Sequence, residues 1–425
     1  MAKVQTFPSA WEGVLSGLVE ENDASGFLTT LGELIGAHHV PSRPHFQLLL
    51  YLAINPPLET TTQTPLSLLS SILSSHSSTS LSALLPCVPS SSREPAWFAW
   101  QAHSELERRV RTYLRPCVDE GIWALLWDRQ KVEKGEKGLN GLRNDAGRNG
   151  VGKGKGKARA NAADSDDEEE EEIEEKVVSA KGWELLEWFL DLWEKDRQEC
   201  AKSDESDGSG CAYSRMLLDQ FRRRGALQID DAAAPLAVVR SSYSEAGYAV
   251  TATSSDRRSA VARLLSLLIN TAICPNPPFH PGSLLLSLLS LLRTLPLNSL
   301  RLLLPTLRDL PPTVLSHLLT HAIEDLGGIR PSKTTERRRD PWRDFGDDRP
   351  FPAPKQEYVW TTLLPMKGSD TARLDLFKMC LASEMLQRYR RGWDFEAKDV
   401  SKIEASLGEG QEAKGVAELV QLMPL

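Results

Sequence analysis

The chain has 425 residues, of which 41% are hydrophobic and 25% are charged, and its formal net charge at pH 7 is −8. This composition is typical of a chain that folds into about two or three domains. The small acidic excess argues against a protein that coats nucleic acid along its whole length, because such a protein is usually basic throughout.

Six cysteines are scattered along the chain, and no two of them form a CxxC pair. A disulfide framework or a zinc finger needs closer pairing, so we expect reduced thiols and neither a metal nor another cofactor. The first residues lack the apolar core of a signal peptide, and no stretch reaches about 18 uninterrupted apolar residues. We therefore expect an intracellular protein without a membrane span.

An N-terminal helical region is predicted over residues 1–131. Apolar residues recur at helical spacing within 9–54, where Ser9 is the expected cap of the first helix. The Ser-, Thr- and Pro-rich residues 55–95 favour short helices joined by loops. The tryptophan-rich stretch 95–131 is the clearest helical segment of this region.

The composition changes over residues 132–178. Lysines and glycines are followed by an acidic block with ten carboxylates between Asp164 and Glu175. Such a segment cannot bury enough apolar surface to offset the cost of ordering its backbone, about 1–2 kcal/mol per residue. We therefore predict a disordered, basic-then-acidic linker between two separately packed helical regions, long enough to let the two regions dock on each other.

The charged segments of the same linker have features of a nuclear targeting signal and of a binding segment for basic partners. Lys153, Lys155, Lys157 and Arg159 form a basic run of the kind that nuclear import receptors read, although glycines interrupt it. Ser165 precedes acidic residues and is a candidate phosphorylation site for an acid-directed kinase. The acidic block should attract basic protein surfaces. These features favour a nuclear protein; the alternatives are a purely solubilising linker and a cytoplasmic protein.

A second helical region is predicted over residues 179–425. Its stronger helices are expected at about 179–200, 213–224, 257–273 and 370–392, and two weaker helices are expected after residue 393. Residues 226–256 are ambiguous, because Ala237–Val239 and Tyr248–Val250 are compatible with short strands. The fold class is therefore mainly α.

Three segments that begin at Pro281, Pro296 and Pro311 share an offset of 15 residues, with leucines in register. Proline suits the first turn of a helix, so each segment predicts a helix of about three turns closed by a tight corner. Pro305 falls inside the second segment and should kink or split it. Stacked helices of this kind form HEAT- or armadillo-like repeats, so 281–326 is predicted to be repeat-like; the alternative is an irregular helical bundle.

The sequence contains no recognisable catalytic motif. Residues 147–153 spell GxxxxGK, but Gly154 stands where a magnesium-binding Ser or Thr belongs. His317 and His321 can share one helix face, yet zinc needs more ligands and the HExxH pattern is absent. His45, which follows Pro44, is interpreted as a loop residue. We expect no enzymatic activity.

The most suggestive basic cluster consists of Arg337, Arg338 and Arg339. Trp342, close behind them, would permit stacking on a base, so these four residues are candidate nucleic-acid contacts. Neighbouring aspartates weaken this hypothesis because they cancel part of the positive charge.

The leading hypothesis is a non-catalytic helical scaffold or assembly factor that binds other proteins in the nucleus. Its partners would include proteins with basic surfaces. The alternative is an accessory subunit that contacts RNA or DNA, for instance in ribosome maturation or chromosome maintenance. A third and weaker alternative is an enzyme whose site is assembled from distant residues.

Overall fold

The computed structural model describes residues 5–57, 64–86, 104–128, 176–204, 213–221, 232–243, 254–273, 281–308, 310–328, 354–388 and 397–421. Within these ranges the chain is mainly α-helical, which confirms the expected fold class. A short parallel pair of strands, in which Gln5 lies opposite His39 and Thr6 opposite Val40, ties the beginning of the chain to the segment before α3.

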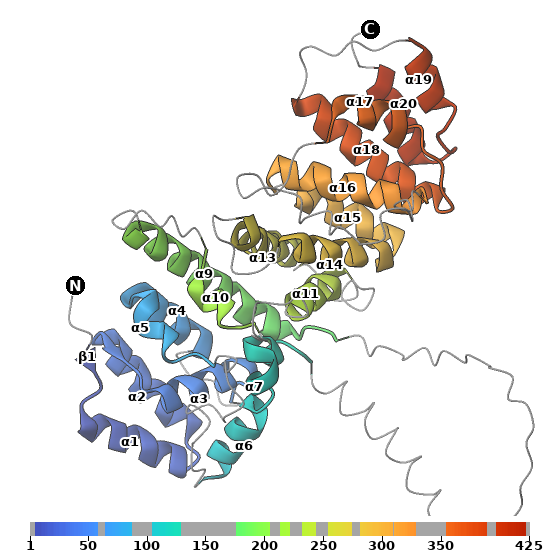
Figure 1. Ribbon diagram of the computed structural model, residues 1–425. Coiled ribbons are helices and arrows are strands. Elements are labelled where there is room, and N and C mark those ends of the chain that lie inside the picture. Colours follow the sequence, from blue (N-terminus) through green and yellow to red (C-terminus); the bar gives the residue numbers. More distant parts are fainter. Residues whose placement is uncertain are drawn as a thin grey trace, which may run out of the picture.

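The N-terminal elements are mostly short helices (Figure 1). They are β1 (Gln5–Thr6), α1 (Ser9–Glu20), α2 (Ala24–Gly36), β2 (His39–Val40), α3 (Arg43–Ile54), α4 (Pro65–Ser75), α5 (Ser78–Ser82), α6 (Glu105–Leu114), α7 (Cys117–Glu120) and the 3-10 helix η2 (Gly121–Leu125).

The remaining elements begin with the longest described helix, α9. They are α9 (Ala180–Asp204), α10 (Arg215–Leu218), α11 (Ala233–Tyr243), α13 (Ser254–Ile273), α14 (Pro281–Thr294), α15 (Leu297–Leu307), α16 (Pro312–Leu326), α17 (Gln356–Tyr358), the π-helical turn η4 (Val359–Leu363), α18 (Thr371–Arg388), α19 (Ala397–Glu404) and α20 (Gln411–Gln421). The last two confirm the helices expected after residue 393.

Helix α9 packs on both sides and joins the two halves of the chain. On one side it contacts α3, α4 and α5, where Phe46 of α3 lies 6.1 Å from Trp188, centroid to centroid. Its Trp193 lies 5.5 Å from Trp123 of η2. On the other side α9 contacts α10 and α13. Helix α9 therefore shares one contiguous apolar core with the helices before the linker.

The end of the predicted linker takes part in this packing, whereas its residues 132–175 lie outside the described ranges. Trp127 and Val178 form an antiparallel bridge, and the amide of Asp128 donates to the carbonyl of Val177 at 2.8 Å. The amide of Val178 donates to the hydroxyl of Ser241 at 2.8 Å. Residues 176–178 therefore belong to the folded part.

A buried carboxylate on α9 holds the starts of two other helices. Asp196 is 5% exposed, and its Oδ1 accepts from the hydroxyl of Ser78, at the start of α5, at 2.8 Å. Its Oδ2 accepts from the hydroxyl of Ser214 at 2.8 Å and from the amide of Met216 at 3.0 Å, both at the start of α10. A buried charge is tolerated when hydrogen bonds of this kind replace its hydration.

From α11 onward the helices are stacked, and many contact the next helix but one in the array (Figure 1). Helix α13 contacts α15, α14 contacts α16, and both α16 and α20 pack against α18. Pro296 and Pro311 immediately precede α15 and α16, which confirms that both prolines lie at helix starts. Pro305 lies inside α15, which continues to Leu307. The helix is therefore not split there.

In the second half, the structure resolves one ambiguous segment as a helix and shortens one expected helix. Ala237–Val239 lie within α11, where Val238 and Val239 are buried, and do not form a strand. The helix expected at 213–224 is reduced to α10, which ends at Leu218. Tyr248–Val250 lie outside the described residues.

None of the helices in the described ranges is long and apolar enough to cross a membrane.

Candidate functional site: a pocket between α1, α3 and α6

The site residues predicted from sequence all lie outside the part of the chain that the structure describes. They are Lys153, Lys155, Lys157, Arg159, Ser165, Arg337, Arg338, Arg339 and Trp342. The GxxxxGK segment at 147–153 lies outside it as well.

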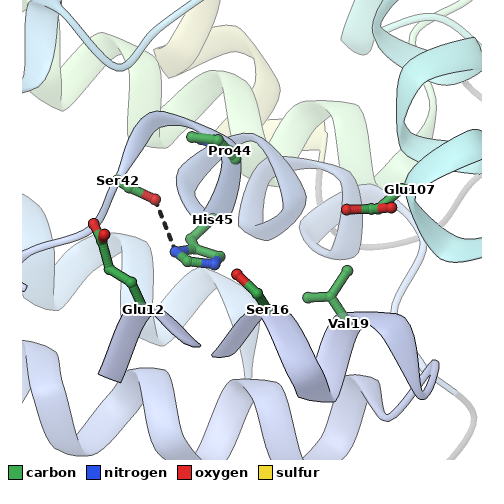
Figure 2. A pocket seen from close by; sticks show the side chains of 7 residues that line it. All are labelled: Glu12, Ser16, Val19, Ser42, Pro44, His45 and Glu107. Carbon is green, nitrogen blue, oxygen red and sulfur yellow. Dashed lines mark hydrogen bonds between the residues drawn. The ribbon is translucent and has the colours of Figure 1, made fainter. Parts of the chain in front are cut away.

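A different group of residues, contributed by three helices, surrounds a pocket of about 290 Å³. Figure 2 shows α1 along one side, the first turn of α3 behind and α6 at the far end. The lining residues are Glu12, Ser16 and Val19 of α1, Ser42, Pro44 and His45 at the start of α3, and Glu107 of α6. We call this the acidic pocket, because two of its side chains are carboxylates.

Local sequence features place the polar side chains of the acidic pocket. Ser104 and Glu107 form a capping box at the start of α6, with the Ser104 amide donating to Oε2 of Glu107 at 2.8 Å. Helix α3 follows Ser42 and has Pro44 in its first turn, a position that proline favours. Glu12 lies in the first turn of α1, where a negative charge suits the helix dipole. Contacts of α1 with α6 bring these starts together.

His45 lies in the first turn of α3 and is 5% exposed, so its assignment to a loop was wrong. Its ring lies between Phe7 and Phe27, with centroid distances of 6.5 and 5.9 Å. This burial lowers the pKa of His45 from its ordinary value of 6.5 to about 4. Nδ1 is 2.8 Å from the hydroxyl oxygen of Ser42. The imidazole is therefore neutral at pH 7 and held in one orientation.

Ser42 and His45 are poorly suited to act as a nucleophile and its base. A general base works best when its pKa lies near the operating pH, and the pKa of His45 lies far below neutrality. Among the described residues, no carboxylate is hydrogen-bonded to the ring as the third member of a Ser-His-Asp triad would be. The Ser42–His45 hydrogen bond instead fixes two polar groups on the wall of the pocket.

The acidic pocket offers acceptors around a small apolar surface. Its carboxylates, hydroxyls and neutral imidazole can accept hydrogen bonds, whereas Val19 and Pro44 can contact hydrocarbon. Glu12 has no ion-pair partner among the residues the structure describes. A cationic group with several N–H donors and an apolar stem has the complementary chemistry.

His317 and His321 do share one face of α16, with ring centroids 4.7 Å apart. His321 Nδ1 is 3.1 Å from Glu324 Oε2, and the Tyr358 hydroxyl donates to Glu324 Oε1 at 2.7 Å. Burial alone would raise the pKa of Glu324, but these hydrogen bonds, together with the electrostatic effect of His321 and His317, outweigh it and lower the pKa. Burial, together with Glu324, raises the pKa of Tyr358 to about 12. This chain of contacts connects α16 to α17.

Across the described ranges, no group of three or more His, Cys, Asp or Glu side chains is arranged to hold a metal ion.

Comparison with known proteins finds no matching family, no matching curated protein and no matching solved structure.

Proposed function

We propose that this chain is a non-catalytic helical scaffold that binds other proteins in the nucleus, and that one partner presents a basic side chain to the acidic pocket. The observation that carries the proposal is the lining of that pocket, where Glu12 and Glu107 face a space of about 290 Å³ beside a neutral imidazole. Such a lining forms more favourable hydrogen bonds and charge interactions with a lysine or arginine side chain than with an anionic phosphate.

The stacking of the helices supports a scaffold of the helical-repeat type. Helices that contact the next helix but one bury a continuous apolar seam and leave long outer faces for partners. The prolines recur every 15 residues, and two of them immediately precede α15 and α16. This offset fits one helix per unit, so that a pair of helices would form a repeat of about 30 residues. We propose HEAT- or armadillo-like stacking on these grounds.

The acidic pocket can bind a basic side chain without rearrangement of the core. Glu12 is only partly buried and lies in the first turn of α1, at the edge of the pocket, so a cation can reach it from solvent. Val19 and Pro44 can contact the methylene groups of a lysine or arginine, as apolar surfaces commonly do for long charged side chains. Glu107 is buried and structurally engaged, so it contributes a fixed negative charge.

Replacing Glu12 by lysine tests this proposal, since it reverses one charge of the pocket without touching the core. We expect the tagged full-length chain to capture a basic protein from nuclear extract after nuclease treatment, and the Glu12→Lys chain to lose at least about 90% of it. Captured proteins are identified by mass spectrometry. Glu33→Lys, an equal charge change at an exposed site on α2, is the matched control and should retain capture.

Equal capture by the two variants would contradict the role of the acidic pocket. Capture that disappears on nuclease treatment would instead support the alternative, an accessory subunit that contacts RNA or DNA. Salt-dependent binding of the purified chain to generic RNA would point the same way.

The nuclear location is proposed from the basic run and the acidic block of the linker. We expect deletion of 153–175 to leave the melting curve of the folded part unchanged but to reduce nuclear accumulation of a fluorescent fusion severalfold, because Lys153, Lys155, Lys157 and Arg159 are removed. A fusion that still accumulates in the nucleus, with the same captured proteins at the same salt, would mean that the linker is only a tether.

A further inference from the structure

A second pocket, of about 250 Å³, is lined by residues of α15, α18 and α20. These helices lie at the opposite end of the molecule from α1, α3 and α6, which line the acidic pocket (Figure 1). Its apolar surface comes mainly from Leu304 of α15 and from Leu376 and Met379 of α18. Arg301 and Arg308 of α15 and Glu412 of α20 supply its charges. We call it the arginine pocket.

The apolar part of the arginine pocket is suited to a hydrocarbon side chain. Leu304 and Leu376 are each 3% exposed, and Met379 is partly buried and packs against the backbone position of Gly415 in α20. Methionine adapts its shape to irregular apolar partners. Burial raises the pKa of the Cys380 thiol, which also lines the pocket, to about 11, so at neutral pH this thiol is protonated and uncharged.

The charges of the arginine pocket do not cancel. Nε of Arg301 donates to Oε1 of the buried Glu412 at 2.5 Å, and Nη1 donates to Oδ1 of Asn298 at 3.2 Å. Arg308 is exposed, and no carboxylate in the described part of the chain forms an ion pair with it. One guanidinium therefore remains for a ligand, beside an apolar surface.

The helix that carries both arginines also has an interrupted hydrogen-bond ladder. Pro305 has no N–H, so the carbonyl of Arg301, four residues earlier, lacks its helical donor. Both residues line the pocket. A peptide amide can satisfy such an acceptor, whereas a phosphodiester and a hydrocarbon have no N–H or O–H to donate.

We propose that the arginine pocket binds a segment of a partner protein in which a carboxylate stands next to an apolar side chain. The carboxylate pairs with Arg308, the apolar side chain contacts Leu304, Leu376 and Met379, and an amide of the segment donates to the carbonyl of Arg301. Arginine is well suited to this role because its planar guanidinium can hold a carboxylate through two parallel hydrogen bonds. The scaffold would then hold a basic partner at one pocket and an acidic partner at the other.

Fluorescence anisotropy of the full-length chain with a labelled peptide tests this inference. The probe is an octapeptide that alternates leucine and glutamate, and its control has glutamine in place of glutamate. We expect the first probe to bind and Arg308→Glu to weaken its binding at least about tenfold, whereas Arg308→Lys should weaken it less. Arg108→Glu, an equal charge change at an exposed arginine of α6, should have no effect.

The results that would overturn the inference are distinct from those that concern the acidic pocket. Absence of binding at millimolar peptide, equal binding to Arg308→Glu and Arg108→Glu, or equal binding of the glutamine control would each refute it. Displacement of the peptide by a single-stranded oligonucleotide, in a manner that depends on Arg308, would make the pocket a phosphate site instead. Glu12→Lys should leave peptide binding unchanged, because Glu12 belongs to the other pocket.

Discussion

Replacing Asp196 by alanine is expected to lower the free energy of unfolding by about 4 kcal/mol. The carboxylate accepts hydrogen bonds from Ser78, Ser214 and the amide of Met216, and it is 5% exposed. A hydrogen bond to a buried charge contributes roughly 1.5–3 kcal/mol, and such contributions add incompletely within one network. Alanine would leave the Ser214 hydroxyl and the Met216 amide without their acceptor and would loosen α10, whereas the Ser78 hydroxyl can still donate to Oε2 of Glu199, 2.8 Å away.

Thermal or urea unfolding of the purified chain measures this effect, with a melting temperature about 10 °C lower as the expected result. Asp191→Ala is the matched control on the same helix. Asp191 is exposed and pairs with Arg263, which keeps Glu194 as a second partner, so its loss should cost less than about 1 kcal/mol. Asp196→Asn should fall between the two. Equal melting of both alanine variants would show that the network does not hold the helices.

Local sequence features were sufficient to predict most helices, because their causes lie within a few residues of the helix. Proline at 296 and 311 set the starts of α15 and α16. The expected cap at Ser9 was wrong by one position, since Pro8 takes the cap and Ser9 begins α1. The segment with Val238 and Val239 stayed ambiguous because β-branched residues are compatible with a strand, whereas the contacts of α11 with other helices cannot be read from the sequence.

The role of α9 could not be predicted, because it depends on contacts between residues far apart in sequence. Ser78 and Asp196 are 118 positions apart, yet they form a hydrogen bond across the linker. The change of composition at residue 132 marks where the sequence becomes polar, and it does not mark the limit of the apolar core. Helix α9 is apolar on more than one side, which is typical of a buried helix, but such a pattern does not identify the helices that cover it.

The acidic pocket could also be predicted only in part, because neighbouring residues determine some of its features and the packing of distant helices determines the others. The spacing of Ser104 and Glu107 is a recognisable capping box in the sequence. The interval between Ser42 and His45 is equally short, and Pro44 between them is typical of a helix start, so the position of His45 in a helix could have been recognised. The convergence of these residues on Glu12 required the packing of α1 against α6.

The last expected result is a loss of stability in mild acid that depends on His45. Its pKa is lowered to about 4 in the folded chain by burial against Phe7 and Phe27, and its ordinary value of 6.5 applies when the chain unfolds. Between these two values the unfolded state binds a proton that the folded state does not bind. Stability therefore falls as the pH is lowered from 6.5 to 4, by on the order of 3 kcal/mol in total.

Chemical unfolding at a series of pH values from 7 to 4 measures this dependence, and the variant His45→Gln isolates the contribution of one residue. Glutamine can still form a hydrogen bond with Ser42 but cannot titrate. The slope of stability against pH, expressed as the number of protons taken up on unfolding, should therefore decrease by up to about one near pH 5. His76, whose pKa is also lowered mainly by burial, would account for part of the slope that remains. His38→Asn is the matched control, because His38 is exposed and has a φ of 62° that asparagine tolerates. The slope should survive in this control, and an unchanged slope in His45→Gln would show that the imidazole can be protonated in place without strain on the pocket.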